Sequence, residues 1–424
     1  MIDLSLMGHG GSFTATVSVP GDKSLSHRAL VFSAMAEGDS LITGLGTGKD
    51  IMSTASALRS LGVDIEGDKV RSPGVGGWAA PDDPIDCGNS GTTMRLLAGA
   101  LSTSGLSAIL VGDSSLMARP MKRLVPPLSA LGATLEVSPG GRPPLRILES
   151  GPVRGASVTI PIASAQVRTA FELAALAANG PSIIDSPAGF RDHTERWLTA
   201  IGRGEWKSAT AFSVSPGSIP PARYEIPGDP SSAAYMWACA AIHPSSSVTT
   251  PTVSLNPGRL GFLEILERMG ARVDAVVTGA TGGDPVGDVT VSSRDLKGLS
   301  IEGDLVAAAL DELPLVAVVA AYAEGITSVR GAGELRAKES DRISSVVEMI
   351  LALGGGIAEY PDGFDVIGTG FLEAGIVETN NDHRIAMSAA VAATRIDTPV
   401  IVRNAQIASV SWPGFYETLE NLWS

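Results

Sequence analysis

Basic residues stand at the starts of several expected helices. In PGDKSLSHR, Lys23 is followed by Ser24 and Arg28, which share a face if the helix begins near Lys23. Arg384 opens a later helix within NNDHR, and Arg119 stands directly before a proline. A cation at a helix N-terminus is unfavourable because it meets the positive end of the helix dipole. The pattern therefore predicts a compensating anion, and a multiply charged ligand is the simplest candidate.

The segment ELRAKESDRISSVVEMILALGG adds two more cations. We expect its helix to begin near Lys338, so that Lys338 and Arg342 share a face and Glu339 lies one turn from Arg342. One such cation would ordinarily be a solvated surface residue. Four turns or helix starts that carry such charges favour a binding site instead.

These residues belong to six repeats of one pattern, in which a short strand, a polar turn and an Ala-rich apolar helix follow one another. The six segments are 17–38, 84–105, 158–180, 224–244, 301–325 and 377–397. A turn that leads into a helix leaves backbone N–H groups unpaired, which suits anions. We therefore expect the binding residues to lie in these turns.

A second repeat marks helix ends of the form φ-x-x-φ-Gly, each followed by a short strand. The glycines are Gly62, Gly132, Gly202, Gly270 and Gly354. Glycine suits a left-handed C-cap, and a spacing of roughly 70 residues indicates supersecondary repeats. A further step reaches FYETLENLWS, which supplies a helix but no strand, and we expect the N-terminal IDLSL to supply it. Chance similarity is the alternative, which the regular spacing disfavours.

Composition indicates a folded protein with two domains. The chain has 424 residues, 44% of them hydrophobic and 18% charged, and its net charge of −14 disfavours nucleic-acid binding. The longest apolar run, 313–322, is too short to cross a membrane, and no secretion signal is evident, so we expect a cytoplasmic protein. Cys87 and Cys239 suggest neither disulfides nor a metal site, and the five histidines have no ligand spacing, so we predict no metal.

Eight segments resemble the EPSP synthase family, along essentially the full length of the chain. They are PGDKSLSHR (20–28), GNSGTTMR (88–95), GDSSLMARPM (112–121), SAQVR (164–168), RDHTE (191–195), DELP (311–314), KESDR (338–342) and NDHRIAM (381–387). Any one could be accidental, but eight in order are specific. The resemblance implies transfer of the enolpyruvyl group of phosphoenolpyruvate to the 5-hydroxyl of shikimate 3-phosphate, without cofactor or metal. We expect a monomer.

The implied fold is α/β, with two similar domains separated by a cleft. Each domain would consist of three βαβαββ units around a pseudo-threefold axis, an inside-out α/β barrel. By similarity, residues 21–227 form the domain that carries the shikimate 3-phosphate motifs. Residues 1–20 plus 228–424 form the other domain, which carries DELP, KESDR and NDHR. This agrees with the six repeats.

The resemblance also implies roles for individual residues. Shikimate 3-phosphate would be bound by Lys23, Ser24, Arg28, Ser164, Ala165, Gln166, Arg191, Asp311 and Lys338. Phosphoenolpyruvate would be bound by Lys23, Asn89, Gly91, Thr92, Arg119, Gln166, Arg342 and Arg384. The catalytic residues would be Lys23, Asp311 and Glu339, because the reaction adds and removes protons and carboxylates of suitable pKa can do both.

Four positions depart from the family pattern. Val410 stands where many members have a Lys that contacts phosphoenolpyruvate, and Glu334 stands where a substrate-contacting Asn is expected. Ala165 replaces a Ser of some members, and Phe190 replaces the serine that often precedes RDHTE. The pattern resembles the branch that includes glyphosate-tolerant forms, but the retained Gly91 leaves tolerance open.

Three alternative functions are less favoured. A UDP-N-acetylglucosamine enolpyruvyl transferase shares the implied fold but uses a loop Cys, and SSLMARPM has none. An RNA 3′-phosphate cyclase would share the repeats but need nucleic-acid contacts, which the acidic composition disfavours. A non-catalytic anion-binding relative is disfavoured because Lys23, Asp311 and Glu339 are all present.

Overall fold

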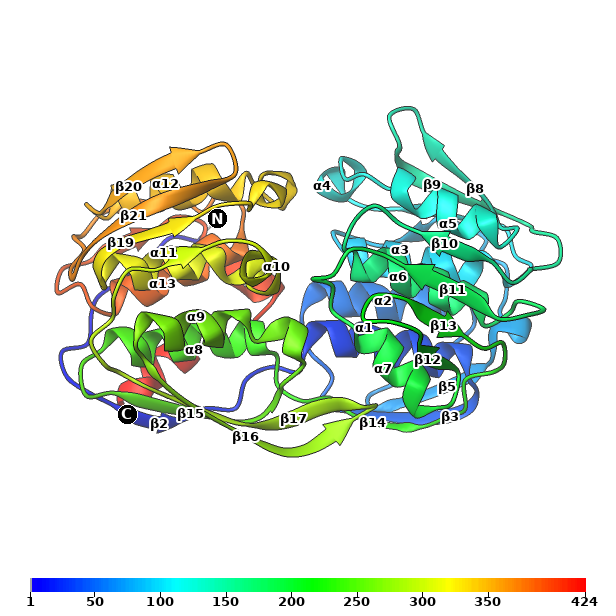
Figure 1. The fold of residues 1–424 in the computed structure, drawn as a ribbon, viewed down its shortest axis with the longest axis horizontal. Coiled ribbons are helices and arrows are strands. Elements are labelled where there is room, and N and C mark those ends of the chain that lie inside the picture. Colours follow the sequence, from blue (N-terminus) through cyan, green and yellow to red (C-terminus); the bar gives the residue numbers. More distant parts are fainter. Residues whose placement is uncertain (1) are drawn as a thin grey trace. The chain divides into compact units, whose positions relative to one another are not determined.

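The computed structural model describes residues 2–424, and the strands of these residues form six small sheets in a mixed α/β fold (Figure 1). The chain forms two compact units. Unit 1 contains the N-terminal residues to Pro20, Pro227–Gly279 and Pro285–Ser424, and unit 2 contains Gly21–Ile226 and Ala280–Asp284. The segment 280–284 therefore belongs to unit 2, whereas the sequence expectation put it with 228–424.

Unit 2 has three four-stranded sheets. In strand order these are β14 (Arg223–Glu225), β3 (Glu37–Thr43), β5 (Lys69–Pro73) and β4 (Asp64–Glu66); β6 (Ile85–Asp86), β7 (Ala108–Val111), β9 (Arg142–Leu148) and β8 (Thr134–Ser138); and β10 (Ser157–Thr159), β11 (Ser182–Asp185), β13 (Phe212–Val214) and β12 (Gly204–Trp206). Its helices are α1 (Lys23–Met35), α2 (Lys49–Arg59), α3 (Gly91–Leu101), α4 (Ser114–Met117), α5 (Val125–Ala130), α6 (Ala165–Ala175) and α7 (His193–Ala200), with the short 3₁₀ helices η1 (Val75–Gly77) and η2 (Lys122–Leu124).

Unit 1 has the other three sheets. They are β2 (Thr14–Thr16), β15 (Ser247–Ser254), β17 (Asp284–Ser292) and β16 (Arg272–Thr281); β18 (Ser300–Ile301), β19 (Glu324–Val329), β21 (Gly363–Thr369) and β20 (Gly356–Tyr360); and β22 (Ile376–Val377), β23 (Val400–Val402) and β1 (Leu4–Leu6). Its helices are α8 (Pro230–Ile242), α9 (Gly261–Met269), α10 (Asp304–Ala308), α11 (Leu313–Ala321), α12 (Arg342–Ala352), α13 (His383–Ala393) and α14 (Phe415–Glu420), with η3 (Pro257–Arg259), η4 (Leu310–Glu312), η5 (Gly333–Ala337), η6 (Ala405–Val410) and η7 (Asn421–Trp423).

All six sheets formed by residues 2–424 share one pairing pattern: two strands pair in parallel, and the second pairs antiparallel with a third. In the last sheet the third place is taken by β1, whose Leu4 lies opposite Val402 of β23. The N-terminal strand thus completes the sixth repeat, which confirms that prediction.

The first and fourth repeats exchange their first strands. β2 precedes α1 in the chain but pairs in parallel with β15, whereas β14 precedes α8 and pairs in parallel with β3. In these two repeats the strand and the helix after it therefore belong to different units. The sequence did not predict this exchange, because strand patterns alone do not identify the pairing partner.

The repeated glycines end helices as predicted. Each follows one of α2, α5, α7, α9 and α12 and precedes a strand of the same sheet repeat. All five have positive φ, between 69° at Gly202 and 114° at Gly270. In this backbone region glycine avoids the Cβ clash that other residues meet, so the chain can leave the helix and turn back into a strand.

Helices form the interior of each unit and strands lie at its surface (Figure 1). α11 is buried at all nine residues, and α8, α13, α3 and α6 are buried on nearly every face. By contrast, β5 alternates exposed and buried residues, as a strand with one solvated face does. A helix that is apolar all round is buried, which explains the Ala-rich segments. Each unit has its own hydrophobic core.

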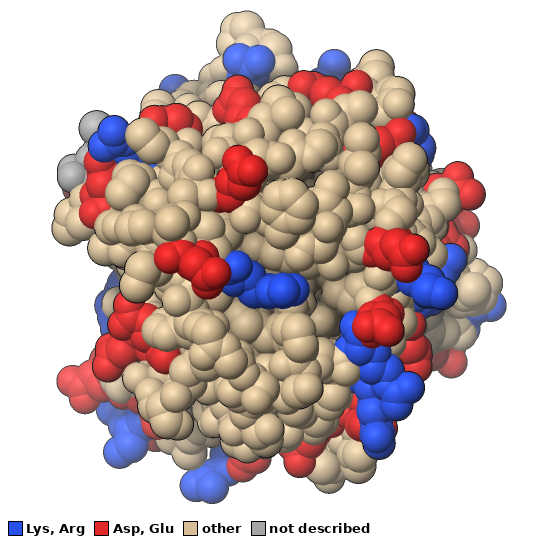
Figure 2. Space-filling model, turned by 90° about the vertical axis from the view of Figure 1, so that its left-hand side faces the viewer, with Lys and Arg blue, Asp and Glu red and all other residues tan. Residues whose placement is uncertain are grey.

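The face of the molecule drawn in Figure 2 intersperses Lys and Arg with Asp and Glu, so this face offers no continuous basic surface to a nucleic acid. Across residues 2–424, no helix combines the length and apolar character needed to cross a membrane. Nor does any group of three His, Cys, Asp or Glu side chains in that range have the arrangement of a metal site.

Candidate functional site

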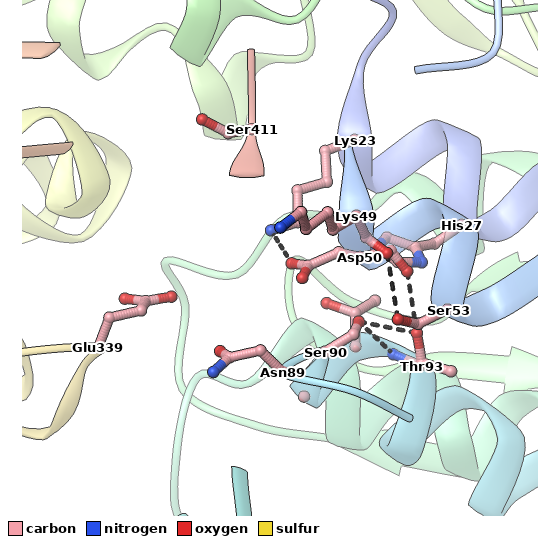
Figure 3. Close-up of polar contacts among 12 residues, drawn as sticks. Lys23, His27, Lys49, Asp50, Ser53, Asn89, Ser90, Thr93, Glu339 and Ser411 are labelled. Atoms are coloured by element: carbon pink, nitrogen blue, oxygen red, sulfur yellow. Dashed lines mark hydrogen bonds and ion pairs between the residues drawn. The ribbon is translucent and has the colours of Figure 1, made fainter. Parts of the chain in front are cut away.

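The polar turn PGDKS leads into helix α1 of unit 2 at the residue that the sequence predicted. Asp22 caps α1, since its Oδ1 accepts a hydrogen bond from the backbone N–H of Leu25 at 2.9 Å. The helix therefore begins at Lys23, and Arg28 Nη1 donates to the carbonyl of Ser24 one turn earlier (3.0 Å). Lys23 forms an ion pair with Asp50 at the start of α2 (Figure 3).

Arg28 is held rigidly inside unit 2. Its side chain is buried, and its Nε and Nη2 donate to the hydroxyls of Thr194 (2.8 Å) and Thr169 (3.0 Å). Burial lowers the pKa of Arg28, although nearby acidic groups, Glu195 first among them, oppose this effect. With the bond to Ser24, three of its five N–H groups donate to the protein.

A chain of hydroxyl groups supports the loop before α3. Ser90 caps α3 by accepting from the backbone N–H of Thr93 (3.1 Å), and the Thr93 hydroxyl donates to Ser90 Oγ (2.7 Å; Figure 3). Thr93 Oγ1 also lies 2.6 Å from Thr54 Oγ1, which is 2.7 Å from His27 Nδ1. These bonds connect the loop to α1 and α2, so its backbone is held before any ligand binds.

Four predicted residues of unit 2 form two hydrogen-bonded pairs, and a residue that was not predicted joins one of these pairs. Arg119 Nη2 donates to Asn89 Oδ1 (2.6 Å), and Gln166 Nε2 donates to Thr92 Oγ1 (2.8 Å). Arg95, which the sequence analysis left unassigned, joins the second pair by donating from Nη1 to Gln166 Oε1 (2.5 Å). The signal was available, because Arg95 follows Thr92 by three residues on one helix face.

Arg95, Arg119 and Arg123 form what we call the arginine cluster. Arg95 is 6% exposed; burial lowers its pKa to about 9, and the positive charges of Arg123 and Arg119 add to this effect. Within residues 2–424, the buried Nε atoms of Arg95 and Arg123 have no hydrogen-bond partner. Neighbouring cations destabilise one another's charge, and a bound anion would relieve this. The N–H groups without a partner could donate to that anion, so the cluster has the charge and the donors of an anion site.

Gly91 is the first residue of α3, and the remaining predicted residues of unit 2 lie at two further helix starts. Ser164 is the N-cap residue of α6 but makes no capping hydrogen bond to the described chain, and Ala165 is the first residue of that helix. Arg191 is half-buried, two residues before α7.

The motif RDHTE, from which only Arg191 was assigned, supplies a buried charge network. Glu195 Oε1 lies 2.5 Å from Arg168 Nε, and Thr194 accepts from Arg28. The guanidinium of Arg168 also stacks 4.0 Å from the ring centre of Phe190. The departure at Phe190 is therefore structural, since the ring covers a buried cation.

In unit 1, four predicted residues come together. Asp311 lies in η4, directly before α11 with its early proline, as the sequence predicted. Its Oδ1 lies 3.4 Å from both Lys338 Nζ and Arg342 Nη1. Glu339 Oε2 lies 2.5 Å from Arg342 Nη2. Two carboxylates and two cations thus meet at one position in this unit.

The expected helix start near Lys338 was wrong. α12 begins at Arg342, because the side chain of Asp341 accepts from the backbone N–H of Ser344 (3.2 Å) and caps the helix there. Lys338 has extended backbone and follows η5. It reaches Asp311 from a loop, and does not share a helix face with Arg342.

Asp382 is a second residue that sequence reasoning missed. It is fully buried and caps α13, with Oδ1 accepting from the backbone N–H of Arg384 (2.9 Å) and Oδ2 from Arg342 Nε (2.8 Å). Burial opposes the charge of Arg342, but Asp382 and Glu339 outweigh it and raise the pKa of that guanidinium. Its place directly before a helix in NDHR was the available signal.

The two remaining departures from the family pattern lie in 3₁₀ helices of unit 1. Val410 is half-buried at the end of η6, and its aliphatic side chain offers no charge to an anion. Glu334 is exposed in η5. Neither position supplies the contact that the family pattern has there.

Two buried histidines predict a loss of stability in acid. Burial lowers the pKa of His27 to about 3 and that of His383 to about 4, whereas an unfolded histidine has a pKa of about 6.5. The unfolded chain therefore binds more protons below pH about 6.5, so the free energy of unfolding should fall from there toward pH about 4.

Urea unfolding at pH about 7.5 and about 5 measures this change. Each unit by which folding lowers a pKa corresponds to at most about 1.4 kcal/mol in the free energy of unfolding. Burial also lowers the pKa of His243, and His27→Gln removes one of these histidines, so it should make the pH dependence shallower. An unaltered slope in this variant would show that His27 does not carry the effect.

Comparison with known proteins gives one consistent match. A family model described as EPSP synthase (3-phosphoshikimate 1-carboxyvinyltransferase) matches residues 8–419. The 3-phosphoshikimate 1-carboxyvinyltransferase of Herpetosiphon aurantiacus is 43% identical over 419 residues, 97% of each chain, and that of Limosilactobacillus fermentum is 41% identical over 415 residues, 96% of each.

Solved structures match over nearly the whole chain as well. An EPSP synthase from Acinetobacter baumannii is similar with a TM-score of 0.90 and 36% identity, covering 99% of this chain and 98% of that one. The enolpyruvyl transferase NikO from Streptomyces tendae has a TM-score of 0.77 over 99% of this chain and 97% of that one, at 20% identity. The second likeness concerns the fold alone.

Proposed function

Because the chain belongs to the EPSP synthase family, we propose that it transfers the enolpyruvyl group of phosphoenolpyruvate to the 5-hydroxyl of shikimate 3-phosphate. The products are 5-enolpyruvylshikimate 3-phosphate and phosphate. This is a step of the shikimate pathway, which leads to the aromatic amino acids. The family match over residues 8–419 and the 43% identical relative support this function over a UDP-N-acetylglucosamine enolpyruvyl transferase.

The arginine cluster is the observation that carries the proposal. Both substrates are anions, so bringing them together costs electrostatic repulsion that fixed cations offset. Around Arg95, the neighbouring cations Arg119 and Arg123 add to burial in disfavouring the charged guanidinium. A phosphate or carboxylate group supplies the missing negative charge.

We assign the substrates to the residues that the family resemblance implied. For shikimate 3-phosphate these are Lys23, Ser24, Arg28, Ser164, Ala165, Gln166, Arg191, Asp311 and Lys338. For phosphoenolpyruvate they are Lys23, Asn89, Gly91, Thr92, Arg119, Gln166, Arg342 and Arg384. Arg95 supports the second set through Gln166, and Asp382 supports it through Arg342.

Lys23, Asp311 and Glu339 would carry the proton transfers. In the addition step, the 5-hydroxyl oxygen bonds to C2 of phosphoenolpyruvate while the hydroxyl loses its proton and C3 gains one. In the elimination step, the new methyl group loses a proton and the C–O bond to phosphate breaks. A carboxyl group that gives a proton in the first step is thereby ready to accept one in the second.

We propose a monomer in the cytosol. Cys87 and Cys239 are both buried free thiols, and burial raises the pKa of each, so neither is poised to react as a thiolate. Unpaired cysteines fit a reducing compartment. The two substrates are the expected partners.

A phosphate-release assay tests the function. Purified protein should release phosphate only when phosphoenolpyruvate and shikimate 3-phosphate are both present, with the enolpyruvyl product formed in equal amount. Release with UDP-N-acetylglucosamine in place of shikimate 3-phosphate would instead support the alternative transferase. No release with either acceptor would leave a non-catalytic anion-binding protein.

Gly91→Ala should weaken phosphoenolpyruvate binding. A Cβ at this position would lie 2.8 Å from Arg95 Nη1, so that guanidinium group must shift, and it would touch Arg119 Nη1 at 3.4 Å, an ordinary contact distance. Overpacking of this kind costs about 1–3 kcal/mol, and we expect the KM for phosphoenolpyruvate to rise by about 5- to 100-fold.

The KM for shikimate 3-phosphate is the internal comparison and should change less. Gly76→Ala is the matched control, because it adds a methyl group in open space, and it should have no effect. Gly67→Ala would not serve, because Gly67 has positive φ. Equal increases for both substrates in Gly91→Ala would contradict a local effect on the arginine cluster.

A further inference from the structure

The two adjacent carboxylates of DELP face different cations. Asp311 lies beside Lys338 and Arg342. Glu312, the next residue, is 4% exposed, and its Oε1 lies 3.3 Å from Arg384 Nη1. The family resemblance assigned a role to the first carboxylate and none to the second, so the ion pair between Glu312 and Arg384 needs an explanation.

Glu312 is itself held from its other side by buried polar groups. The hydroxyl of Ser231 donates to Glu312 Oε1 (2.5 Å), and it accepts from Arg259 Nη2 (2.7 Å). The same Nη2 donates to Asp229 Oδ1 at 2.7 Å. Asp229, Ser231 and Arg259 are each at most 7% exposed, so a continuous buried chain of polar contacts ends at Arg384.

This chain begins in a turn that repeats the first turn of unit 2. PGDPS matches PGDKS, and Asp229 caps α8 as Asp22 caps α1. Pro230 stands where the first turn has Lys23, so the fourth turn lacks the cation that would bind an anion. Its Ser231 instead donates to Glu312.

We propose that Glu312 is a positioning residue, which orients the guanidinium of Arg384 for phosphoenolpyruvate and is itself oriented by Ser231 and Arg259. This inference rests on the proposed function, which assigns Arg384 to phosphoenolpyruvate. A long, flexible cation loses rotational freedom when it binds a ligand, and a fixed carboxylate removes that freedom beforehand. The hydrogen bond from Ser231 keeps Glu312 from following Arg384 if that guanidinium moves.

The charges around Arg384 favour a positioning role for Glu312. Burial opposes the charge of Arg384, but Asp311, Tyr235, Glu312 and Asp229 outweigh it and raise the pKa of the guanidinium. Arg384 therefore stays charged, and Glu312 acts on its position. Because Glu312 touches none of the proposed proton-transfer residues in these contacts, its loss should affect substrate binding more than turnover.

Glu312→Gln tests the proposal, because glutamine keeps the shape and can still accept from Ser231 but loses the ion pair. We expect the KM for phosphoenolpyruvate to rise about tenfold, with kcat and the KM for shikimate 3-phosphate within about twofold of the unmodified enzyme. Glu324→Gln, at an exposed residue of β19, is the matched control and should change nothing.

Ser231→Ala provides a second measurement if Glu312→Gln fails to fold. It should raise the same KM about threefold, and combined with Glu312→Gln it should add little, because Ser231 acts through Glu312. Equal effects on both substrates with a lower Tm, or an unchanged KM for phosphoenolpyruvate, would overturn the positioning role alone. Absence of turnover in the unmodified enzyme would overturn the proposed function, and this inference with it.

Discussion

Asp311→Asn should lower kcat by about 10²- to 10⁴-fold, the usual cost of losing a positioned acid or base. The amide cannot take the hydroxyl proton, but its oxygen can still accept from Lys338 and Arg342, whose nitrogens lie 3.4 Å from Asp311 Oδ1. Binding of shikimate 3-phosphate should therefore stay within about tenfold. It could even strengthen, because one negative charge that repels the phosphate is removed.

Turnover and affinity must be measured separately to check this. Single-turnover rates and the Kd for shikimate 3-phosphate distinguish chemistry from binding, and Tm reports folding. Asp295→Asn, at an exposed loop residue of unit 1, is the matched control and should leave all three unchanged. A near-normal kcat in Asp311→Asn would contradict the assignment of Asp311 as a catalytic residue.

Local features of the fold were predictable wherever a short-range rule decides the structure. The left-handed glycines after α2 and α9, Gly62 and Gly270, follow from the C-cap preference. The start of α1 at Lys23 follows from the capping aspartate before it. Even the return of β1 to the last sheet was predictable, because the repeat count left one strand missing.

Long-range pairing was not predictable in the same way. β2 and β14 both precede a PGD turn and are similar short strands, so nothing local decides which of them pairs with β3. The exchange depends on tertiary packing. The position of the segment 280–284 in unit 2 has the same cause, since its Asp284 lies 3.1 Å from His193 of α7.

The site shows a similar limit. Motif positions identified the residues that meet, but not the contacts between them. Lys338 was placed on a helix because the spacing to Arg342 allowed it, and the cap at Asp341 decided otherwise. Arg95 and Asp382 were missed although their positions gave a signal, because sequence position does not reveal that Arg95 donates to Gln166 or that Asp382 accepts from Arg342.

Arg342 and Arg384 of unit 1 differ from Arg95 of unit 2 in the charges that surround them. In unit 1, Arg342 has Asp382 and Glu339, and Arg384 has Glu312, as carboxylate partners. In unit 2, burial and the neighbouring arginines Arg119 and Arg123 instead depress the pKa of Arg95. An added anion should therefore stabilise the charge of Arg95 more strongly, whereas paired carboxylates should hold Arg342 and Arg384 in place.

Glu339→Gln separates two roles that the structure makes possible for this residue. Glu339 Oε2 lies 2.5 Å from Arg342 Nη2, so it can orient the cation that we propose for phosphoenolpyruvate as well as move a proton. If it moves a proton, kcat should fall by about 10²- to 10⁴-fold while the KM for phosphoenolpyruvate stays near normal. If it only orients Arg342, that KM should rise and kcat should recover at saturation.

We expect the first result. Asp382 Oδ2 lies 2.8 Å from the Nε of Arg342, so the guanidinium keeps one buried carboxylate when Glu339 is neutralised. Arg342 is 1% exposed and cannot swing into solvent, which limits the loss of orientation. Glu324→Gln again serves as the exposed control. A raised KM with normal kcat would instead make Glu339 a positioning residue and leave Asp311 and Lys23 to transfer the protons.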